Sequence, residues 1–201
     1  MADRDHSRIL TQLPGYAIGV DPGELDVARF EAQLGTAGAA ARAGSWDQAA
    51  AGARAALWRG EPLADVESQA VALREVPVLA EKRLQALETR LDADLHLGGH
   101  ADVIAELRRL AAAYPLREHL HALLMLALYR CGRQAEALAA YRDALRVLVE
   151  ELGTEPGTGL RELHQRILNA DPVLSLPEPG PPPAGSPVPA VPRELPSWLN
   201  T

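Results

Sequence analysis

Residues 120–153 read LHALLMLALYRCGRQAEALAAYRDALRVLVEELG, and this stretch decides the fold. Apolar residues in its first half recur at helical spacing and cover almost the whole circumference of one helix. In its second half one helical face is apolar and the opposite face is charged. The turn between the two halves is Cys131-Gly132-Arg133, and Gly153 stands where a left-handed C-terminal cap is expected. The stretch therefore predicts an antiparallel helix pair whose first member is buried in the middle of the protein.

Two helix pairs upstream repeat this pattern. When the turn glycines Gly44, Gly98 and Gly132 are aligned, small or apolar residues follow five, nine and twelve positions later in each pair. Gly98 and Gly132 are 34 residues apart (132 − 98), which is the tetratricopeptide period. The first unit is longer, and we expect it to carry an insertion of about twenty residues, from Gly60 to roughly Pro77. The expected fold is all-α, a tetratricopeptide-like superhelix of antiparallel helix pairs whose concave face binds protein segments.

Caps and apolar stripes place the individual helices. Asp26 is a suitable N-cap for the first helix. Ser45, followed by Gln48 three positions later, fits a capping box for the second. Pro77 is suited to the start of a long third helix, which Gly98 and Gly99 stop. The predicted helices span about residues 26–44, 46–58, 77–97, 101–114, 120–131, 134–152 and 156–169.

The two ends of the chain do not follow a helical pattern. Residues 1–21 contain two short strand-like runs around Pro14 and Gly15, which predicts a β-hairpin. Because an isolated two-stranded hairpin is marginal in water, we expect it to lie on the helices that follow or on a domain upstream. Residues 172–201 hold ten of the sixteen prolines and lack apolar periodicity, so we expect a disordered Pro-rich linker.

Composition restricts the classes of function. The net charge of −7 argues against a polyanion-binding surface over the whole chain. Cys131 is the single cysteine, so an intrachain disulfide is excluded. No apolar run approaches the roughly 18 residues of a membrane-spanning helix, and the N-terminus lacks the pattern of a secretion signal. We therefore expect a cytoplasmic protein without a membrane partner.

The sequence offers no constellation for catalysis. A G-x₄-G-K-[ST] phosphate loop and a G-x-S-x-G nucleophile elbow are both missing, so we expect neither an enzyme nor a cofactor. His96 and His100 are four residues apart, but two glycines interrupt the helix that would align them. His119 and His121 point to different helical faces. We therefore expect solvated surface histidines rather than a metal site.

Arginines are the candidates for a surface that faces an acidic partner. Arg108 and Arg109 are adjacent, and a second set lies in the opening stretch, namely Arg130, Arg133, Arg142 and Arg146. The alternative, which the spacing favours, is local pairing at i to i+3 or i+4 with Glu136 and Asp143 on exposed helix faces.

Three stretches in a fixed order carry a family likeness: LTQLPGYAIGVDPGELDVARFE (residues 10–31), ALWRGEPLADV (56–66) and the opening stretch continued into ELGTEPGTGLRELHQRIL (151–168). Together they resemble the bacterial transcriptional activator domain of the antibiotic regulatory protein family. The resemblance implies that this tetratricopeptide-like domain occupies residues 22–171. It also implies that residues 1–21 are the wing of a winged helix-turn-helix domain that this chain lacks, through which alone DNA would be bound. Residues 172–201 resemble the linker that leads to an ATPase module in larger members.

The resemblance implies a regulatory or protein-interaction domain of a transcriptional activator of secondary-metabolite genes. Its expected partners are RNA polymerase or sigma factor, a second protomer, or adjacent domains of the full regulator. The alternative, from a different class, is a sensor that encloses a pathway metabolite and gates the attached DNA-binding domain.

Overall fold

The computed structural model describes residues 9–21, 24–57 and 68–175. The predicted all-α fold with a short N-terminal hairpin is confirmed over these ranges. In chain order the elements are β1 (Ile9–Gln12), β2 (Gly15–Ile18), α1 (Asp26–Arg42), α2 (Trp46–Ala56), α3 (Gln69–His96), α4 (His100–Ala113), α5 (Glu118–Arg130), α6 (Gln134–Leu152), α7 (Thr158–Leu168) and the 3₁₀ turn η1 (Pro172–Leu174).

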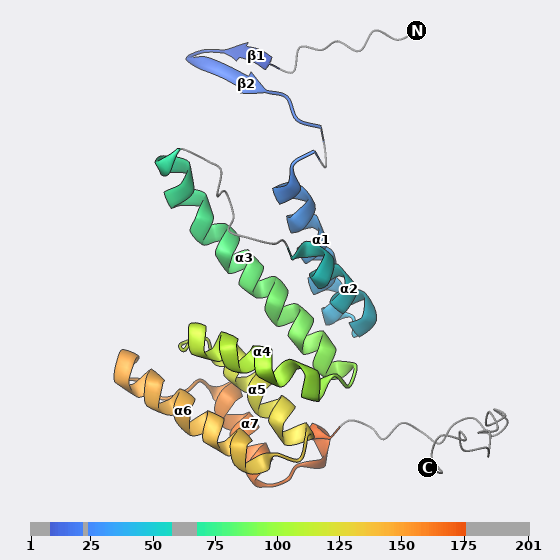
Figure 1. Ribbon diagram of the computed structural model, residues 1–201, viewed down its shortest axis with the longest axis vertical. Helices are drawn as coiled ribbons and strands as arrows, with labels where there is room; N and C mark the ends of the chain where they lie inside the picture. The colour runs from blue at the N-terminus through green and yellow to red at the C-terminus, as the bar shows by residue number, and fades with distance from the viewer. Residues whose placement is uncertain (1–8, 22–23, 58–67, 176–201) are drawn as a thin grey trace, which may run out of the picture.

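Helix α3, 28 residues long, joins two packed groups of helices. In Figure 1 its middle and C-terminal half lie beside α1 and α2, and its C-terminal end leads into the group formed by α4, α5, α6 and α7. Fully buried alanines fill the contact with α1 and α2, where they let the helix axes approach closely: Ala49, Ala50, Ala86 and Ala93. Larger side chains fill the second group, among them Leu91, Leu95, Leu107 and Leu128.

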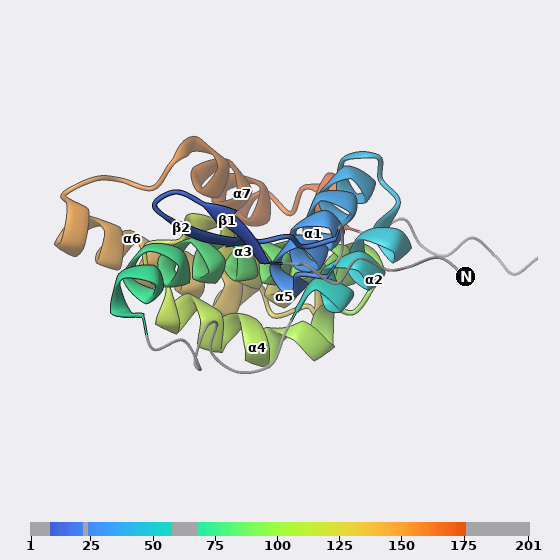
Figure 2. The ribbon, with the colours of Figure 1, turned by 90° about the horizontal axis from the view of Figure 1, so that it is seen from above.

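Helix α5 is the centre of the second group. It packs against α3, α4, α6 and α7, and Figure 2 shows it between α4 and α7. Leu120 and Met125 are fully buried, and Leu128 is only 1% exposed. The prediction that this helix is covered on all sides is therefore confirmed, because four neighbours share the apolar surface that encircles it.

The three turn glycines adopt the backbone conformation that their alignment predicts. Gly44, Gly98 and Gly132 have φ of 73°, 90° and 74°, and Gly153 caps α6 at φ 66°. This left-handed region is unfavourable for residues with a Cβ atom. The three pairs therefore turn by the same device, which supports the repeat.

The long third helix begins earlier than predicted. Helix α3 starts at Gln69, eight residues before Pro77 (77 − 69), and Pro77 lies inside it. The prediction treated Pro77 as a first-turn proline because proline has no N–H to donate. The residues before it, QAVALREV, are mostly compatible with a helix, which continues through the proline. The predicted insertion is thus partly helical, and residues 58–67 lie outside the described residues.

Two local predictions at helix ends need correction. Ser45 is the N-cap of α2 as predicted, but its hydroxyl makes no capping hydrogen bond, so the capping box is absent. The chain also stays with the core beyond residue 171. Asp171 accepts a hydrogen bond from the backbone N–H of Val173 at 3.0 Å, and Leu174 is 7% exposed. The predicted linker therefore begins after η1, and its residues 176–201 lie outside the described residues.

The hairpin pairs in antiparallel register, with Ile9 opposite Ile18 and Thr11 opposite Tyr16. Its apolar side chains stay in solvent, since Ile9, Tyr16 and Ile18 are 64%, 80% and 70% exposed. Figure 1 shows it at one end of the molecule. The sequence predicts that the hairpin lies either on the helices or on a domain upstream. The helices leave its apolar side chains largely uncovered.

The turn geometry yields a test with opposite signs at two glycines. Gly132→Ala should destabilise the protein by about 1–2 kcal/mol, because a Cβ at positive φ is strained even where space is open around it. Gly35→Ala, in the interior of α1 with equally open space, should stabilise by about 0.5–1 kcal/mol. Urea denaturation measures both, and shifts of the same sign would contradict this account of the turn.

Candidate functional site: a groove between α4 and α6

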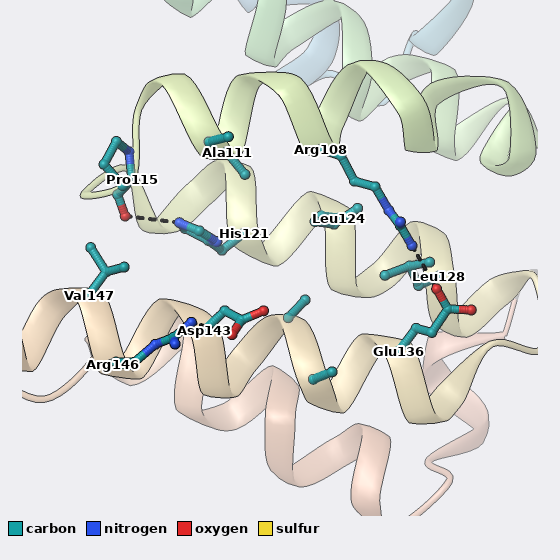
Figure 3. A pocket seen from close by; sticks show the side chains of 13 residues that line it. Arg108, Ala111, Pro115, His121, Leu124, Leu128, Glu136, Asp143, Arg146 and Val147 are labelled. Atoms are coloured by element: carbon teal, nitrogen blue, oxygen red, sulfur yellow. Dashed lines mark hydrogen bonds and ion pairs between the residues drawn. The ribbon is translucent and has the colours of Figure 1, made fainter.

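A groove of about 540 Å³ runs between α4 and α6, with α5 as its floor (Figure 3). Leu124 and Leu128 of α5 form the floor and are 7% and 1% exposed. The walls are built from small residues on both sides: Ala111, Ala112, Ala139 and Ala140. Because α4 and α6 both pack on α5, and alanines line the space between them, the groove stays open above an apolar floor.

One end of the groove carries two guanidinium groups on a single carboxylate. Arg108 of α4 donates from Nη2 to Glu136 Oε2 at 2.6 Å. Arg133 donates to both oxygens of the same carboxylate, at 2.8 and 2.7 Å. Hydrogen bonds from Arg133 and then Arg108 lower the pKa of Glu136. This end is therefore ionised at neutral pH, with one positive charge in excess.

The opposite end is lined by a buried histidine and an exposed ion pair. His121 is 7% exposed, and its Nε2–H donates to the carbonyl oxygen of Pro115 at 2.9 Å (Figure 3). On the rim, Arg146 donates to Asp143 at 2.7 Å. Each of these polar groups has a partner, and the charges of the ion pair cancel. The groove is thus electrically asymmetric along its length.

The structure separates the four arginines that the sequence groups together. Arg146 lines the groove, and Arg133 reaches its positive end through Glu136. Arg142 is exposed on α6 but is not among the residues that line the groove. The alternative of i to i+3 pairing is confirmed for Arg133 with Glu136 and for Arg146 with Asp143.

Arg130 lies apart from the other three, in an internal position. Its Nε donates to the carbonyl of Leu174 at 2.9 Å and its Nη1 to that of Leu95 at 3.1 Å. Burial lowers the pKa of this guanidinium. Arg130 therefore links η1 to the C-terminal end of α3. It is not among the residues that line the groove.

The expectation of solvated surface histidines holds for His119 and is wrong for His121, which the central position of α5 carries into the core. His96 stacks on Trp46 with ring centroids 3.7 Å apart. His100 has a buried Nδ1 that lacks a hydrogen-bond partner. Over the ranges that the structure describes, no three His, Cys, Asp or Glu side chains converge to hold a metal ion.

Sequence reasoning did not identify the groove. Its walls come from pairs of consecutive alanines on two helices, which carry no motif in the sequence. A usable signal was present, since Arg108 on α4 and Glu136 on α6 have opposite charge and the 34-residue repeat places their helices in equivalent positions. The Arg108–Glu136 ion pair joins these two helices at one end of the groove. The repeat therefore indicates which two helices enclose the groove.

The fold and the groove define a class of protein: a helical-repeat domain with an open groove on its surface. The family model of the bacterial transcriptional activator domain matches residues 25–168. The chain belongs to this family, the activator domain of the antibiotic regulatory proteins, as its sequence signatures predicted.

Relatives of this chain are named regulatory proteins. AfsR of Streptomyces coelicolor is 50% identical over 174 residues, which cover 85% of this chain and 17% of AfsR. DnrI of Streptomyces peucetius is 42% identical over 174 residues, which cover 86% of this chain and 64% of DnrI. The chain thus spans less than two thirds of either relative.

A solved structure shares the fold. Mycobacterium tuberculosis EmbR, in complex with a low-affinity phosphopeptide, matches with a TM-score of 0.75 and 35% identity, over 81% of this chain and 43% of EmbR. In the part of the chain that the structure describes, no helix is both long enough and apolar enough to cross a membrane.

Two half-buried histidines predict how stability depends on pH. Burial, and then the charge of Arg130, lower the pKa of His100 from 6.5, and burial lowers the pKa of His164. Below about pH 6.5 the unfolded chain therefore binds more protons than the folded one, so stability should fall as pH falls. Melting temperatures between about pH 7 and pH 5 measure this slope.

The matched variants separate His100 from the exposed His119. His100→Gln should flatten the slope of melting temperature against pH, because the lost side chain no longer titrates differently in the two states. His119→Gln is the matched control, because His119 is exposed on α5. An unchanged slope in the His100 variant would contradict the role given to its burial.

Proposed function

We propose that residues 22–171 are the regulatory protein-interaction domain of a bacterial transcriptional activator, and that the groove between α4 and α6 is its binding surface. One observation carries this proposal: an open groove with an apolar floor and a charged rim, on a domain of the activator family. Its work is binding rather than catalysis, in the cytoplasm. The partners are RNA polymerase or sigma factor, a second protomer, or adjacent domains, and the regulated genes are those of secondary metabolism.

DNA binding is assigned to a neighbouring domain. Residues 1–21 form the wing of a winged helix-turn-helix domain, and residues 172–201 contain the linker on the other side. The hairpin supports its assignment as a wing. Its side chains Ile9, Tyr16 and Ile18 are largely exposed, which suits them to packing against a domain other than residues 22–171. The net charge of −7 agrees with DNA contact elsewhere in the regulator.

A metabolite sensor is the second candidate, because about 540 Å³ falls within the range of small-molecule pockets. A small polar ligand needs hydrogen-bonding groups that are free to receive it. In the groove, His121 and Arg146 already bond to Pro115 and Asp143. The open shape and the paired rim therefore favour a protein segment, the class of partner that the EmbR complex also contains.

Deletion of residues 25–170 from the intact regulator tests the interaction role. We expect promoter activation and self-association to be lost while the attached DNA-binding domain still binds its promoter fragment. Full activation by the deletion variant would refute the proposal.

A thermal-shift screen tests the sensor, since a metabolite at 100 times its Kd should add about 2.7 kcal/mol of stability. A shift with any pathway intermediate would favour the sensor.

A further inference from the structure

We infer that the groove between α4 and α6 takes an apolar segment of a partner protein that carries a carboxylate, and that this carboxylate lies against Arg108, while Arg133 stays paired with Glu136. The inference rests on the proposed function and specifies the chemistry of its partner. Three properties of the groove lead to this inference: the apolar character of its surface, its length, and the position of its surplus positive charge.

The surface of the groove matches apolar side chains. Leu124 and Leu128 supply a floor that is almost fully buried by the protein itself, and Ala112 on one wall is exposed. Alanine walls leave room for side chains that enter from outside. Because the floor is already buried, the apolar area that a ligand removes from water is that of the walls, where Ala112 is exposed and Ala139 and Ala140 are half-buried; its removal is favourable by about 25 cal/mol per Å².

The length of the groove fits a short segment of chain. The α4 wall runs from Arg108 to Pro115, which corresponds to about 10 Å at 1.5 Å per residue. That distance accommodates about two turns of a helix or about three residues of an extended strand. The partner therefore presents two or three apolar side chains in succession, rather than a single one.

The charge distribution places an acidic group at one end. Arg108 and Arg133 share Glu136, and only Arg108 and Glu136 line the groove there. Arg108 is a half-exposed side chain, so it can turn to a second carboxylate while Arg133 retains Glu136 through two hydrogen bonds. A carboxylate from a partner would bring this end to neutrality, whereas a lysine or arginine would be repelled.

Selection from a display library of random peptides about twelve residues long, against the full 201-residue chain, tests the inference without a known partner. We expect the selected peptides to combine consecutive apolar residues with Asp or Glu. Recovery of no binding peptide, or of peptides rich in Lys and Arg, would overturn the inference.

Two alanines of α4 provide a matched pair for the position of the site. Ala112 lines the groove, whereas its exposed neighbour Ala113 does not. Ala112→Leu should weaken a selected peptide at least about tenfold, because the added side chain occupies the space of the ligand. Ala113→Leu should bind as the wild type. Equal binding by both variants, with melting temperatures unchanged, would place the site elsewhere.

Charge variants test the carboxylate contact, with opposite expected signs. Arg108→Gln should weaken an acidic peptide about threefold, and Glu136→Gln should tighten it by a similar factor, as expected for exposed ion pairs. Arg109→Gln is the control, because Arg109 is exposed on the same helix but does not line the groove. An equal effect of the Arg108 and Arg109 substitutions would show only general attraction and would overturn the specific contact.

The same variants separate this inference from the proposed function. If deletion of residues 25–170 abolishes activation but Ala112→Leu leaves both activation and peptide binding intact, the groove inference fails and the proposed function stands. If a dimer seen by sedimentation dissociates in Ala112→Leu but not in Ala113→Leu, the occupant is a second copy. A metabolite whose thermal shift disappears in Ala112→Leu would likewise replace the peptide as the occupant.

Discussion

The rest of the structure depends on the need to cover α5 from every side. A helix that is apolar around its circumference is stable in water only inside a protein, and α3, α4, α6 and α7 together enclose it. Leu174 of η1 belongs to the same core. Because α4 and α6 both direct their apolar faces to α5, a groove walled by alanines is left between them, in which Ala112 is exposed to solvent. The groove is therefore a product of the same constraint that holds the domain together.

Ion pairs link the helices that surround α5. Arg117, just before α5, donates to both oxygens of Glu88 on α3 at 2.9 and 3.2 Å and pairs with Glu81 at 2.8 Å. The Glu88 carboxylate, and then Glu81, hold the pKa of Arg117 above its usual value. Arg90 pairs with Glu106 of α4 at 2.6 Å. A bidentate guanidinium contact has a preferred orientation, so the Arg117–Glu88 pair sets register as well as distance between α5 and α3.

Features that depend on neighbouring residues could be predicted from the sequence, and features that depend on distant contacts could not. Gly132 and Gly153 identify their turns because positive φ is a local demand. The burial of His121 depends on four surrounding helices. The start of α3 is an exception, because its cause is local: residues 69–76 form a helix that continues through Pro77. The candidate arginines divide in the same way. The pairing of Arg133 and Arg146 follows from their spacing, whereas the carbonyls that bind Arg130 are 35 and 44 residues away.

The length of α3 has a mechanical consequence. At 1.5 Å per residue its 28 residues span about 42 Å, so one rigid element extends from the end near the hairpin to the helices around the groove. Pro77 removes one hydrogen bond from this rod and weakens it against bending at a single place. C-terminal to Pro77, α3 is held by its contacts with α2 and by the ion pair of Glu88 with Arg117. The position at which the helix lacks a hydrogen bond therefore lies in its N-terminal third, on the side of the hairpin and away from the groove.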